Sequence, residues 1–414
     1  MAVVSAPYSA GSGFGRGGWR DFDWWLLLVV VALSVWGCVT IVSATRPNAD
    51  TFVAQTATAT THDGNSASVS PTIHLEKAHS TRLSDGLKQA MWVSAGLCAL
   101  LLLTLVDYQV LMHLQFGLYV LNLGLLGLVL KLGREINGAK SWIPIGPFAL
   151  QPAEFAKFAI IVTLAAFLCR RQEKIREFST LMWSLAYMAP PCLLILKQPD
   201  FGTTVAIMSI WVGMLFFGGA RLWHLALIIF VAGTVFGIAW KTDKLKPHQK
   251  ARLAVFLDTN PSNSEARKAG YQINQSQIAI GSGQITGQGW GKGMQKQAGY
   301  VPENTTDFIF TVVAEELGFV GAATLILAYL LLLFRSATLT MTTENYFGVL
   351  IAGGFTALIA FHTIINLGMT MRVMPITGVP LPFFSYGGSS YISFSLCVGL
   401  LQSIAMRRRR MGMM

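Results

Sequence analysis

The chain contains 414 residues, of which 53% are hydrophobic and 12% are charged, against about 25% charged residues in an ordinary soluble domain. This composition excludes a soluble globular protein and predicts an integral membrane protein. The basic residues that produce the net charge of +11 flank apolar stretches, so anionic membrane lipid and not nucleic acid is the expected partner. The five cysteines lie in or beside apolar runs without paired spacing, which predicts neither a disulfide framework nor a zinc site.

Apolar stretches of roughly 20 residues are long enough to cross a membrane as helices. Ten such stretches predict an all-α fold with about ten transmembrane helices. No small-residue cleavage site follows the first stretch, which predicts a transmembrane helix and not a signal peptide. The predicted spans are 24–45, 86–106, 110–131, 153–169, 183–197, 202–219, 221–241, 308–334, 345–370 and 388–406.

Short basic loops remain on the cytoplasmic side of a membrane. With ten spans, all five basic sites of this chain fall on one face, which predicts that both termini are cytoplasmic. We therefore predict a cytoplasmic tail at 1–23, a membrane domain at 24–406 and a basic cytoplasmic tail at 407–414. The five basic sites are Arg16 with Arg20, the segment 170–176, Arg221, Arg335 and the segment 407–410.

The opposite, outer face then receives the loops 46–85, 132–152, 198–201, 242–307 and 371–387. The loop 46–85 is rich in Thr, Ala and Ser, which predicts a poorly ordered, variable insertion. The loop 242–307, before the eighth helix, mixes Gly-rich sequence with Lys and Arg and is long enough to form a functional surface element. No internal repeat indicates an inverted-repeat transporter.

An acid and a base occur together at the start of the fourth span. Pro152 suits the first turn of a helix, and Glu154 in that turn interacts favourably with the helix dipole. Glu154 and Lys157 are three residues apart, so they lie on one helix face and can pair. Two interpretations stay open: the pair only neutralises two charges in the membrane, or it belongs to a functional site.

Two further outer segments carry charged residues. Asp200, in the link 198–201, is either a helix cap or part of a polar site. Arg372 begins a proline-rich segment that predicts a rigid re-entrant turn, which is tolerated at membrane depth only where it is buried in protein or lines a cavity. Arg372 itself either faces an anionic headgroup or extends toward the membrane interface.

The Gly-rich segment 279–293 does not match a nucleotide-binding motif. Lys292 is followed by Gly293 rather than by Ser or Thr, and the glycine spacing fits neither the P-loop nor the dinucleotide fingerprint. Two alternatives stay open, namely that its backbone amides cradle a phosphate and that it is a plain flexible loop.

Asp307 lies where the loop 242–307 meets the eighth span. A carboxylate at the rim of a membrane span is costly to desolvate, which makes Asp307 a candidate for chemistry. The alternative is an N-cap for the following helix. Its surroundings favour chemistry, because the neighbouring charged residues are predicted to lie on the same outer face and to form one polar cluster. They are Glu303, the Glu154–Lys157 pair, Asp200 and Arg372.

Six motifs follow one another along the chain. They are Gln151-Pro-Ala-Glu154, Gln198-Pro-Asp-Phe-Gly-Thr, Tyr271-Gln with Gln275-Ser and Ile278-Ala-Ile-Gly-Ser-Gly, Thr306-Asp-Phe-Ile-Phe, Glu315-Glu-Leu-Gly-Phe and Pro382-Phe-Phe-Ser-Tyr-Gly-Gly-Ser-Ser. With these motifs in this order, the chain resembles the SEDS family, the shape, elongation, division and sporulation proteins, over about residues 24 to 406. Ala153 departs from the family pattern, in which serine is common. Gly378-Val-Pro-Leu-Pro and Tyr300-Val-Pro-Glu-Asn-Thr-Thr-Asp resemble the elongation branch, RodA, more than the division branch, FtsW.

The resemblance implies a peptidoglycan glycosyltransferase of the bacterial cytoplasmic membrane, an inverting hexosyltransferase with an undecaprenyl-pyrophosphate-linked donor. Such an enzyme polymerises lipid II into the growing glycan strand on the outer face during cell elongation and shape maintenance. A class B penicillin-binding protein transpeptidase is the implied protein partner. No cofactor is certain, and a divalent cation, Mg or Mn, is one expected source of positive charge at the leaving group.

The resemblance also assigns roles to individual residues. Asp307 matches the essential aspartate of the family, and we predict that it acts as the general base. The remaining predicted substrate-binding or cavity residues are Glu154, Lys157, Trp142, Gln151, Asp200, Arg372 and Ser385, with Lys157 and Arg372 as candidate cations near the leaving group.

Two other classes of function stay open. A lipid II flippase or a solute transporter suits ten spans with polar residues equally well, but its polar groups would follow a pathway across the bilayer instead of gathering on one face. A scaffold for a transpeptidase is compatible with catalysis.

Overall fold

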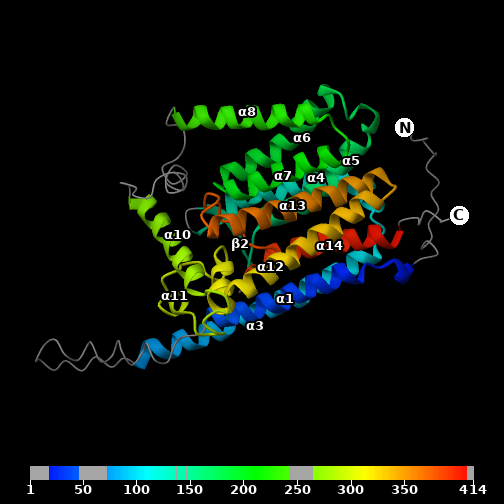
Figure 1. Ribbon diagram of the computed structural model, residues 1–414. Coiled ribbons are helices and arrows are strands. Elements are labelled where there is room, and N and C mark those ends of the chain that lie inside the picture. The colour runs from blue at the N-terminus through cyan, green and yellow to red at the C-terminus, as the bar shows by residue number, and fades with distance from the viewer. Residues whose placement is uncertain (1–17, 46–71, 137–138, 146–147, 242–263, 408–414) are drawn as a thin grey trace, which may run out of the picture.

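The computed structural model describes residues 18–45, 72–136, 139–145, 148–241 and 264–407, which form mainly helices that run side by side (Figure 1). Ten of these helices coincide with the ten stretches predicted to cross the membrane. They are α1 Trp24–Ala44, α3 Thr72–Leu105, α4 Val110–Leu132, α5 Pro152–Cys169, α6 Phe178–Lys197, α7 Phe201–Phe217, α8 Leu222–Lys241, α12 Ile309–Thr342, α13 Tyr346–Thr370 and α14 Gly388–Arg407.

Eight of the ten helices are long and apolar enough to cross a membrane, counted over the described residues. The other two, α7 and the Leu222–Val231 part of α8, are apolar but shorter. Helix α7 is short because Asp200 caps its start and Gly218 ends it, with the next residue, Gly219, at a φ of 86°. The predicted multi-pass, helical membrane architecture is therefore confirmed, with α7 as the shortest of the ten helices.

Three helix boundaries differ from the prediction by more than three residues, and one of them is the start of α6 at Phe178 instead of residue 183. Helix α3 begins at Thr72, where helix-forming Leu, Glu, Lys and Ala follow, so this end of the predicted loop 46–85 is helical. The rest of that loop, 46–71, lies outside the described residues. Helix α12 continues to Thr342 instead of ending near residue 334, and in this extension threonine hydroxyls donate to carbonyls one turn earlier.

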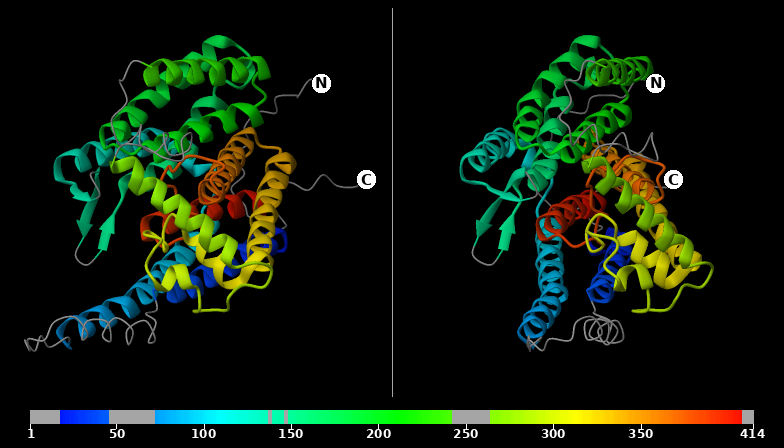
Figure 2. Two further views of the ribbon diagram at one scale, coloured as in Figure 1. Left: turned by 60° about the vertical axis from the view of Figure 1, so that its left-hand side comes forward. Right: turned by 90° about the vertical axis from the view of Figure 1, so that its left-hand side faces the viewer.

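The loop 132–152 contains a small antiparallel sheet that was not predicted. Its strands, β1 Arg134–Ile136, β2 Ala139–Ile145 and β3 Phe148–Leu150, are hydrogen-bonded in the order β1-β2-β3. The sheet projects to one side of the helices (Figure 2). The strands β1 and β3, of three residues each, are too short to show an alternation of polar and apolar residues, and Pro144 inside β2 weakens its strand signal, which explains why the sequence pattern missed them.

Three helices form the centre of the molecule. Burial reaches 83% of the most apolar stretch of α14, 78% of that of α5 and 67% of that of α13, against 22% for α3 and 17% for α4. Figure 2 shows α14 near the middle of the surrounding helices. The first turns of α5 and α14 therefore lie inside protein, which allows polar side chains at these helix ends to be shielded from lipid.

Helix α12 is broken at Gly318, whose φ of 63° and ψ of −158° are not helical. The break leaves backbone groups of the segment 315–320 without partners in the helix, and the Gly-rich segment 284–289 pairs with them. Four backbone hydrogen bonds join the two segments, from Gln288 N to Glu315 O at 3.0 Å, Gly289 N to Glu316 O at 2.9 Å, Phe319 N to Gln284 O at 2.8 Å and Val320 N to Ile285 O at 3.1 Å. The prediction of a plain flexible loop is therefore wrong for residues 284–289.

The rest of the loop before α12 is also ordered by polar contacts. It holds α10 (Ser264–Ser282) and the single turn α11 (Met294–Gln297). Lys296 of α11 is buried, and its ammonium lies 2.5 Å from Glu316 Oε1 and donates to Ser43 Oγ of α1 at 3.1 Å. The neighbouring Glu315 carboxylate accepts the backbone N–H groups of Gln295 and Lys296. These contacts hold α11 against α1 and α12.

Replacing Gly318 by Ala is expected to lower the free energy of unfolding by about 2 kcal/mol or more, because its backbone conformation is open essentially to glycine alone. The new Cβ would also lie 2.6 Å from the Ile285 carbonyl oxygen. The matched control is Gly124→Ala in α4, where a Cβ meets nothing within 4 Å. Thermal unfolding of both variants in detergent measures the difference, and equal midpoints would contradict the account of the kink.

Candidate active site

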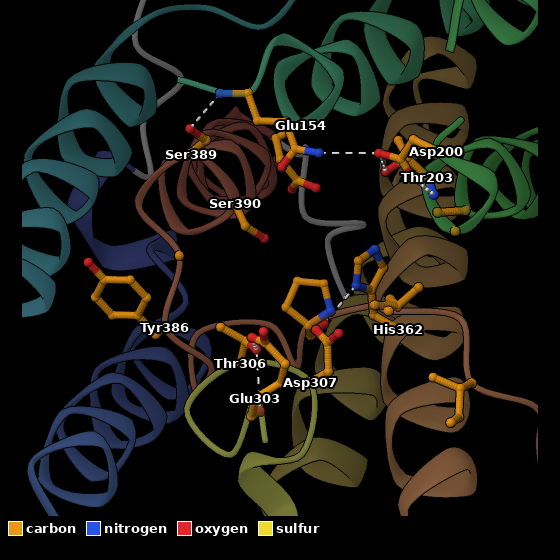
Figure 3. A pocket seen from close by; sticks show the side chains of 18 of the residues that line it. Glu154, Asp200, Thr203, Glu303, Thr306, Asp307, His362, Tyr386, Ser389 and Ser390 are labelled. Atoms are coloured by element: carbon orange, nitrogen blue, oxygen red, sulfur yellow. Dashed lines mark hydrogen bonds between the residues drawn. The ribbon is translucent and has the colours of Figure 1, made fainter. Parts of the chain in front are cut away.

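A cavity of about 520 Å³ lies where the start of α5, α7 and α14 meets the segment before α12 and the segment 371–387 (Figure 3). Six of the eight predicted site residues line this one cavity. In Figure 3 Glu154 and Asp200 lie on one side of the hollow, and Asp307 and Glu303 lie across from them. The six are Trp142, Gln151, Glu154, Lys157, Asp200 and Asp307.

The Glu154–Lys157 pair forms as predicted and is buried. Pro152 occupies the first turn of α5, and the two side chains three residues apart place Lys157 Nζ 2.7 Å from Glu154 Oε2. Both side chains are at most 5% exposed. The carbonyl of Glu154 also accepts a hydrogen bond from Ser393 Oγ of α14 at 2.6 Å, which fixes this turn against the central helix.

The lysine has further neighbours from two other helices. His362 of α13 places Nε2 3.4 Å from Lys157 Nζ, and the ring centroid of Phe394 of α14 lies 5.1 Å from the same nitrogen. His362 lines the cavity and is buried. The ammonium of Lys157 therefore sits where α5, α13 and α14 meet, in surroundings that exclude lipid.

Asp200 is both a helix cap and a cavity residue, so its two interpretations hold together. As the N-cap of α7, it accepts the backbone N–H of Thr203 at 2.9 Å and the Thr203 hydroxyl at 2.8 Å. It also accepts a hydrogen bond from Gln151 Nε2 at 3.2 Å, which orients that amide at the cavity wall. Burial raises the pKa of the Asp200 carboxyl, an effect that the hydrogen bonds from Thr203 partly offset.

Asp307 is not the helix cap, because α12 begins at Ile309 and Phe308 occupies the N-cap position. Its peptide is held from α13, where Asn366 Nδ2 donates to the Asp307 carbonyl at 2.9 Å and to the Val379 carbonyl at 2.8 Å. One buried amide therefore joins the segment before α12 to the segment 371–387 and sets the backbone that carries the carboxylate.

Ser385 lies behind the cavity wall instead of in it. Its hydroxyl donates to the Thr306 carbonyl at 2.6 Å and accepts the Leu381 N–H at 2.9 Å, so it supports the peptide just before Asp307. Arg372, at a φ of 60°, is likewise absent from the residues that line the cavity. The structure thus brings six predicted residues together and leaves these two outside.

The 381–385 part of the segment 371–387 is buried in protein, as expected for irregular backbone at the depth of a membrane, whereas Met371 and Val373 at its start are exposed. Phe383 and Phe384 are buried within it, and the Tyr329 hydroxyl of α12 donates to the Pro382 carbonyl at 2.5 Å. The predicted rigid turn is confirmed in this respect. Its carbonyls also supply the acceptors that hold side chains of α13.

The cavity carries more carboxylates than cations. Glu154, Asp200, Glu303 and Asp307 face a single lysine among the described lining residues. No three His, Cys, Asp or Glu side chains of the described residues converge as metal ligands. Among the described residues, these four carboxylates are therefore not gathered into a ready-made site for a divalent cation.

Sequence reasoning missed His362, Asn366 and Ser389. Ser389 Oγ accepts the Gln151 N–H at 3.0 Å and lines the cavity (Figure 3). An ionisable side chain inside an apolar span is a signal that should have singled out His362, as it singled out Lys157. Asn366 and Ser389 carry no such signal, because amides and hydroxyls are common inside membrane helices.

The comparisons agree on one family. A model described as Cell cycle protein, covering FtsW, RodA and SpoVE, matches residues 65–410. The "Probable peptidoglycan glycosyltransferase FtsW" of Nitrosococcus halophilus is 37% identical over 298 residues, which cover 70% of this chain and 74% of that protein. Its counterpart in Idiomarina loihiensis is 37% identical over 308 residues, which cover 71% of each chain.

Solved structures are similar over almost the whole chain. A chain from a peptidoglycan synthase complex that coordinates polymerization and crosslinking has a TM-score of 0.71 and 29% identity, with coverage of 94% of this chain and 98% of that one. RodA of Thermus thermophilus has a TM-score of 0.63 and 27% identity, with the same coverage. This chain therefore belongs to the FtsW/RodA/SpoVE family of cell cycle proteins, the SEDS peptidoglycan glycosyltransferases.

Proposed function

We propose that this chain polymerises lipid II into glycan strands in the cavity at the start of α5, with Asp307 as the general base. The observation that carries the proposal is that Asp307 and the buried Glu154–Lys157 pair line the same cavity. Glycosyl transfer needs a base for the attacking hydroxyl and positive charge for the departing group, and this cavity holds a candidate for each.

The proposed reaction forms one glycosidic bond. The 4-hydroxyl of the acceptor GlcNAc loses its proton to Asp307, and its oxygen attacks the anomeric carbon of the donor MurNAc with inversion. The bond from that carbon to undecaprenyl pyrophosphate breaks, and the leaving group takes the electron pair. Lys157 supplies positive charge toward the developing anion, while Glu154 keeps the buried ammonium paired when substrate is absent.

The same proposal places the cavity on the outer face of the bacterial cytoplasmic membrane and both termini in the cytoplasm. Its support is the distribution of basic residues, since Arg20 precedes α1, the segment 170–176 follows α5 and Arg335 lies near the end of α12. The end of the molecule that carries α10 and α11 lies opposite the first turn of α1 and the last turn of α14 (Figure 1).

A class B penicillin-binding protein transpeptidase is the proposed partner. Support comes from the likeness to a chain of a peptidoglycan synthase complex that coordinates polymerization and crosslinking. Co-purification of such a transpeptidase with the wild-type chain tests the proposal, and its absence from repeated purifications under mild detergent would count against it.

The cellular role has two candidates. The motif at 378–382, the motif at 300–307 and the likeness to RodA of Thermus thermophilus support elongation. Curated relatives with 34 to 38% identity are named FtsW, which supports division instead. Depletion in the native bacterium separates the two, because loss of an elongation enzyme rounds the cells whereas loss of a division enzyme leaves filaments.

Reconstitution of the purified chain in proteoliposomes tests the proposed chemistry against the transport alternative. Lipid II is supplied, and glycan polymer and lipid translocation are measured in the same vesicles. We expect polymer that depends on Asp307, with translocation no faster than in vesicles that carry an Asp307→Asn variant. Fast translocation without polymer would make the chain a transporter and overturn the proposal.

A further inference from the structure

Lys157 is held by three side-chain neighbours that come from different places in the chain. Glu154 lies one turn earlier on α5 and pairs with the ammonium at 2.7 Å. His362 of α13 and Phe394 of α14 approach the same nitrogen from two other helices, at 3.4 Å and, measured to the ring centroid, 5.1 Å. Glu154 alone would draw the flexible lysine back along its own helix, so the position of the charge depends on the contacts from α13 and α14.

The hydrogen bonds of His362 determine which ring nitrogen carries the proton. Nδ1 lies 2.9 Å from the Pro380 carbonyl oxygen, which only accepts hydrogen bonds, so Nδ1 is the protonated nitrogen. Nε2 then presents its lone pair to the ammonium of Lys157. A protonated Nε2 would place two cationic groups in contact, which the buried site disfavours. The ring is therefore neutral and acts as an acceptor for Lys157.

Asn366 lies one turn after His362 on the same face of α13, because the two residues are four apart. Its amide holds the carbonyls of Asp307 and Val379, while His362 holds the carbonyl of the next residue, Pro380. Both side chains are buried, at 0% and 1% exposure. One helix face thus contacts both the base and the cation that the proposed reaction uses.

We propose that this face of α13 positions the two reacting groups relative to each other, with His362 fixing Lys157 and Asn366 fixing the peptide of Asp307. Neither residue touches the reacting atoms in this role, so both are positioning residues. The inference rests on the proposed function, because it needs Lys157 and Asp307 to act in the same step. A purely structural role would instead change stability and leave turnover of the folded enzyme unchanged.

A pair of substitutions separates the two hydrogen bonds of His362. In His362→Asn the amide nitrogen replaces Nδ1 and keeps the bond to Pro380, but nothing reaches Lys157. In His362→Gln the longer side chain places an amide oxygen near the position of Nε2 and restores an acceptor for the ammonium. We expect kcat for lipid II polymerisation to fall about tenfold in the Asn variant, as for loss of one hydrogen bond to a charged group, with KM little changed.

The Gln variant is expected to recover at least about a third of the wild-type kcat, since its acceptor is neutral and close in length to the imidazole. If His362→Asn does not fold, the test rests on His362→Gln alone, whose kcat must reach at least about a third of the wild-type value to support the inference. His224→Asn is the matched control, because His224 lies on α8 outside the cavity and contacts Phe178 with its ring. Thermal unfolding of each variant separates loss of turnover from loss of fold.

Asn366→Asp tests the second contact. An aspartate at this position has no amide donor and faces the carbonyls of Asp307 and Val379 with a carboxyl group, so kcat is expected to fall by about tenfold or more in protein that still folds. If Asn366→Asp does not fold, Asn366→Ser replaces it, with the same kcat criterion. A wild-type kcat in folded His362→Asn, or in the folded Asn366 variant, would overturn the inference. Equal losses of kcat in His362→Asn and His362→Gln would also overturn it.

These outcomes differ from failure of the proposed function. If the wild-type chain makes no polymer, or if Lys157→Met retains full activity, the proposed chemistry fails. The positioning role then fails with it, because it requires Lys157 and Asp307 to act in the reaction. If Lys157→Met is inactive while His362→Asn is fully active, the chemistry stands and the inference fails.

Discussion

Replacing Asp307 by Asn is expected to reduce lipid II polymerisation by about 10²- to 10⁴-fold, the usual contribution of a positioned general base. The amide has the size and shape of the carboxyl group but cannot take the proton of the attacking sugar hydroxyl. The backbone at this position is held through the Asp307 carbonyl by Asn366, a contact that the substitution leaves in place. Polymer length and yield from purified protein in detergent or proteoliposomes measure the effect.

Folding of the Asp307→Asn variant is checked by its thermal unfolding midpoint, which is expected to lie near that of the wild type. Asp107→Asn is the matched control, since Asp107 is 43% exposed and pairs with Arg407 at 3.8 Å, away from the cavity. The control is expected to retain full polymerisation, because an exposed ion pair contributes little to stability. Full activity in well-folded Asp307→Asn would remove the base assignment.

Replacing Lys157 by Met is expected to reduce both activity and stability. Lys157 is the one Lys or Arg among the described lining residues, so its loss removes the positive charge that would stabilise the anionic leaving group. A loss of about 10²-fold in turnover is typical for one such electrostatic contact. The carboxylate of Glu154 would remain buried without its partner, which costs about 3–5 kcal/mol of folding free energy. Polymerisation and thermal unfolding are measured on the same preparation.

The double variant Glu154→Gln with Lys157→Met separates the two effects. It removes both charges from the buried site, and replacing a whole buried ion pair is often close to neutral for stability. We therefore expect the unfolding midpoint to return toward that of the wild type while polymerisation stays low. A double variant that polymerises lipid II at the wild-type rate would instead show that the pair only neutralises two charges in the membrane.

Features that depend on neighbouring residues were predictable from the chain. The ten helices follow from apolar runs of about 20 residues, and the Glu154–Lys157 contact follows from a spacing of three on one helix. The cap formed by Asp200 follows from its place directly before α7. Each of these features lies within one helix or one turn of it, where the geometry of the backbone decides which groups meet.

Features that depend on distant segments were not predictable in this way. The spacing of glycines in the segment 279–293 suggested a phosphate cradle or a flexible loop, whereas the actual partner of its 284–289 part is the backbone of α12 at the kink of Gly318. The side chain of Ser385 was expected in the cavity, but it supports the Thr306 carbonyl from behind the wall. A linear pattern contains no information about which of several possible acceptors a hydroxyl or an amide will reach.

The sequence by itself determined that this protein is a helical membrane protein and, by resemblance, that Asp307 is its candidate base, because composition, apolar length and ordered motifs are properties of the chain. Only the tertiary structure decided that Asp307, Lys157 and Asp200 share one cavity and that His362 and Asn366 hold two of them from α13. The physical reason is that burial and hydrogen-bond partners of a polar group are set by the packing of separate helices, which the order of residues does not specify.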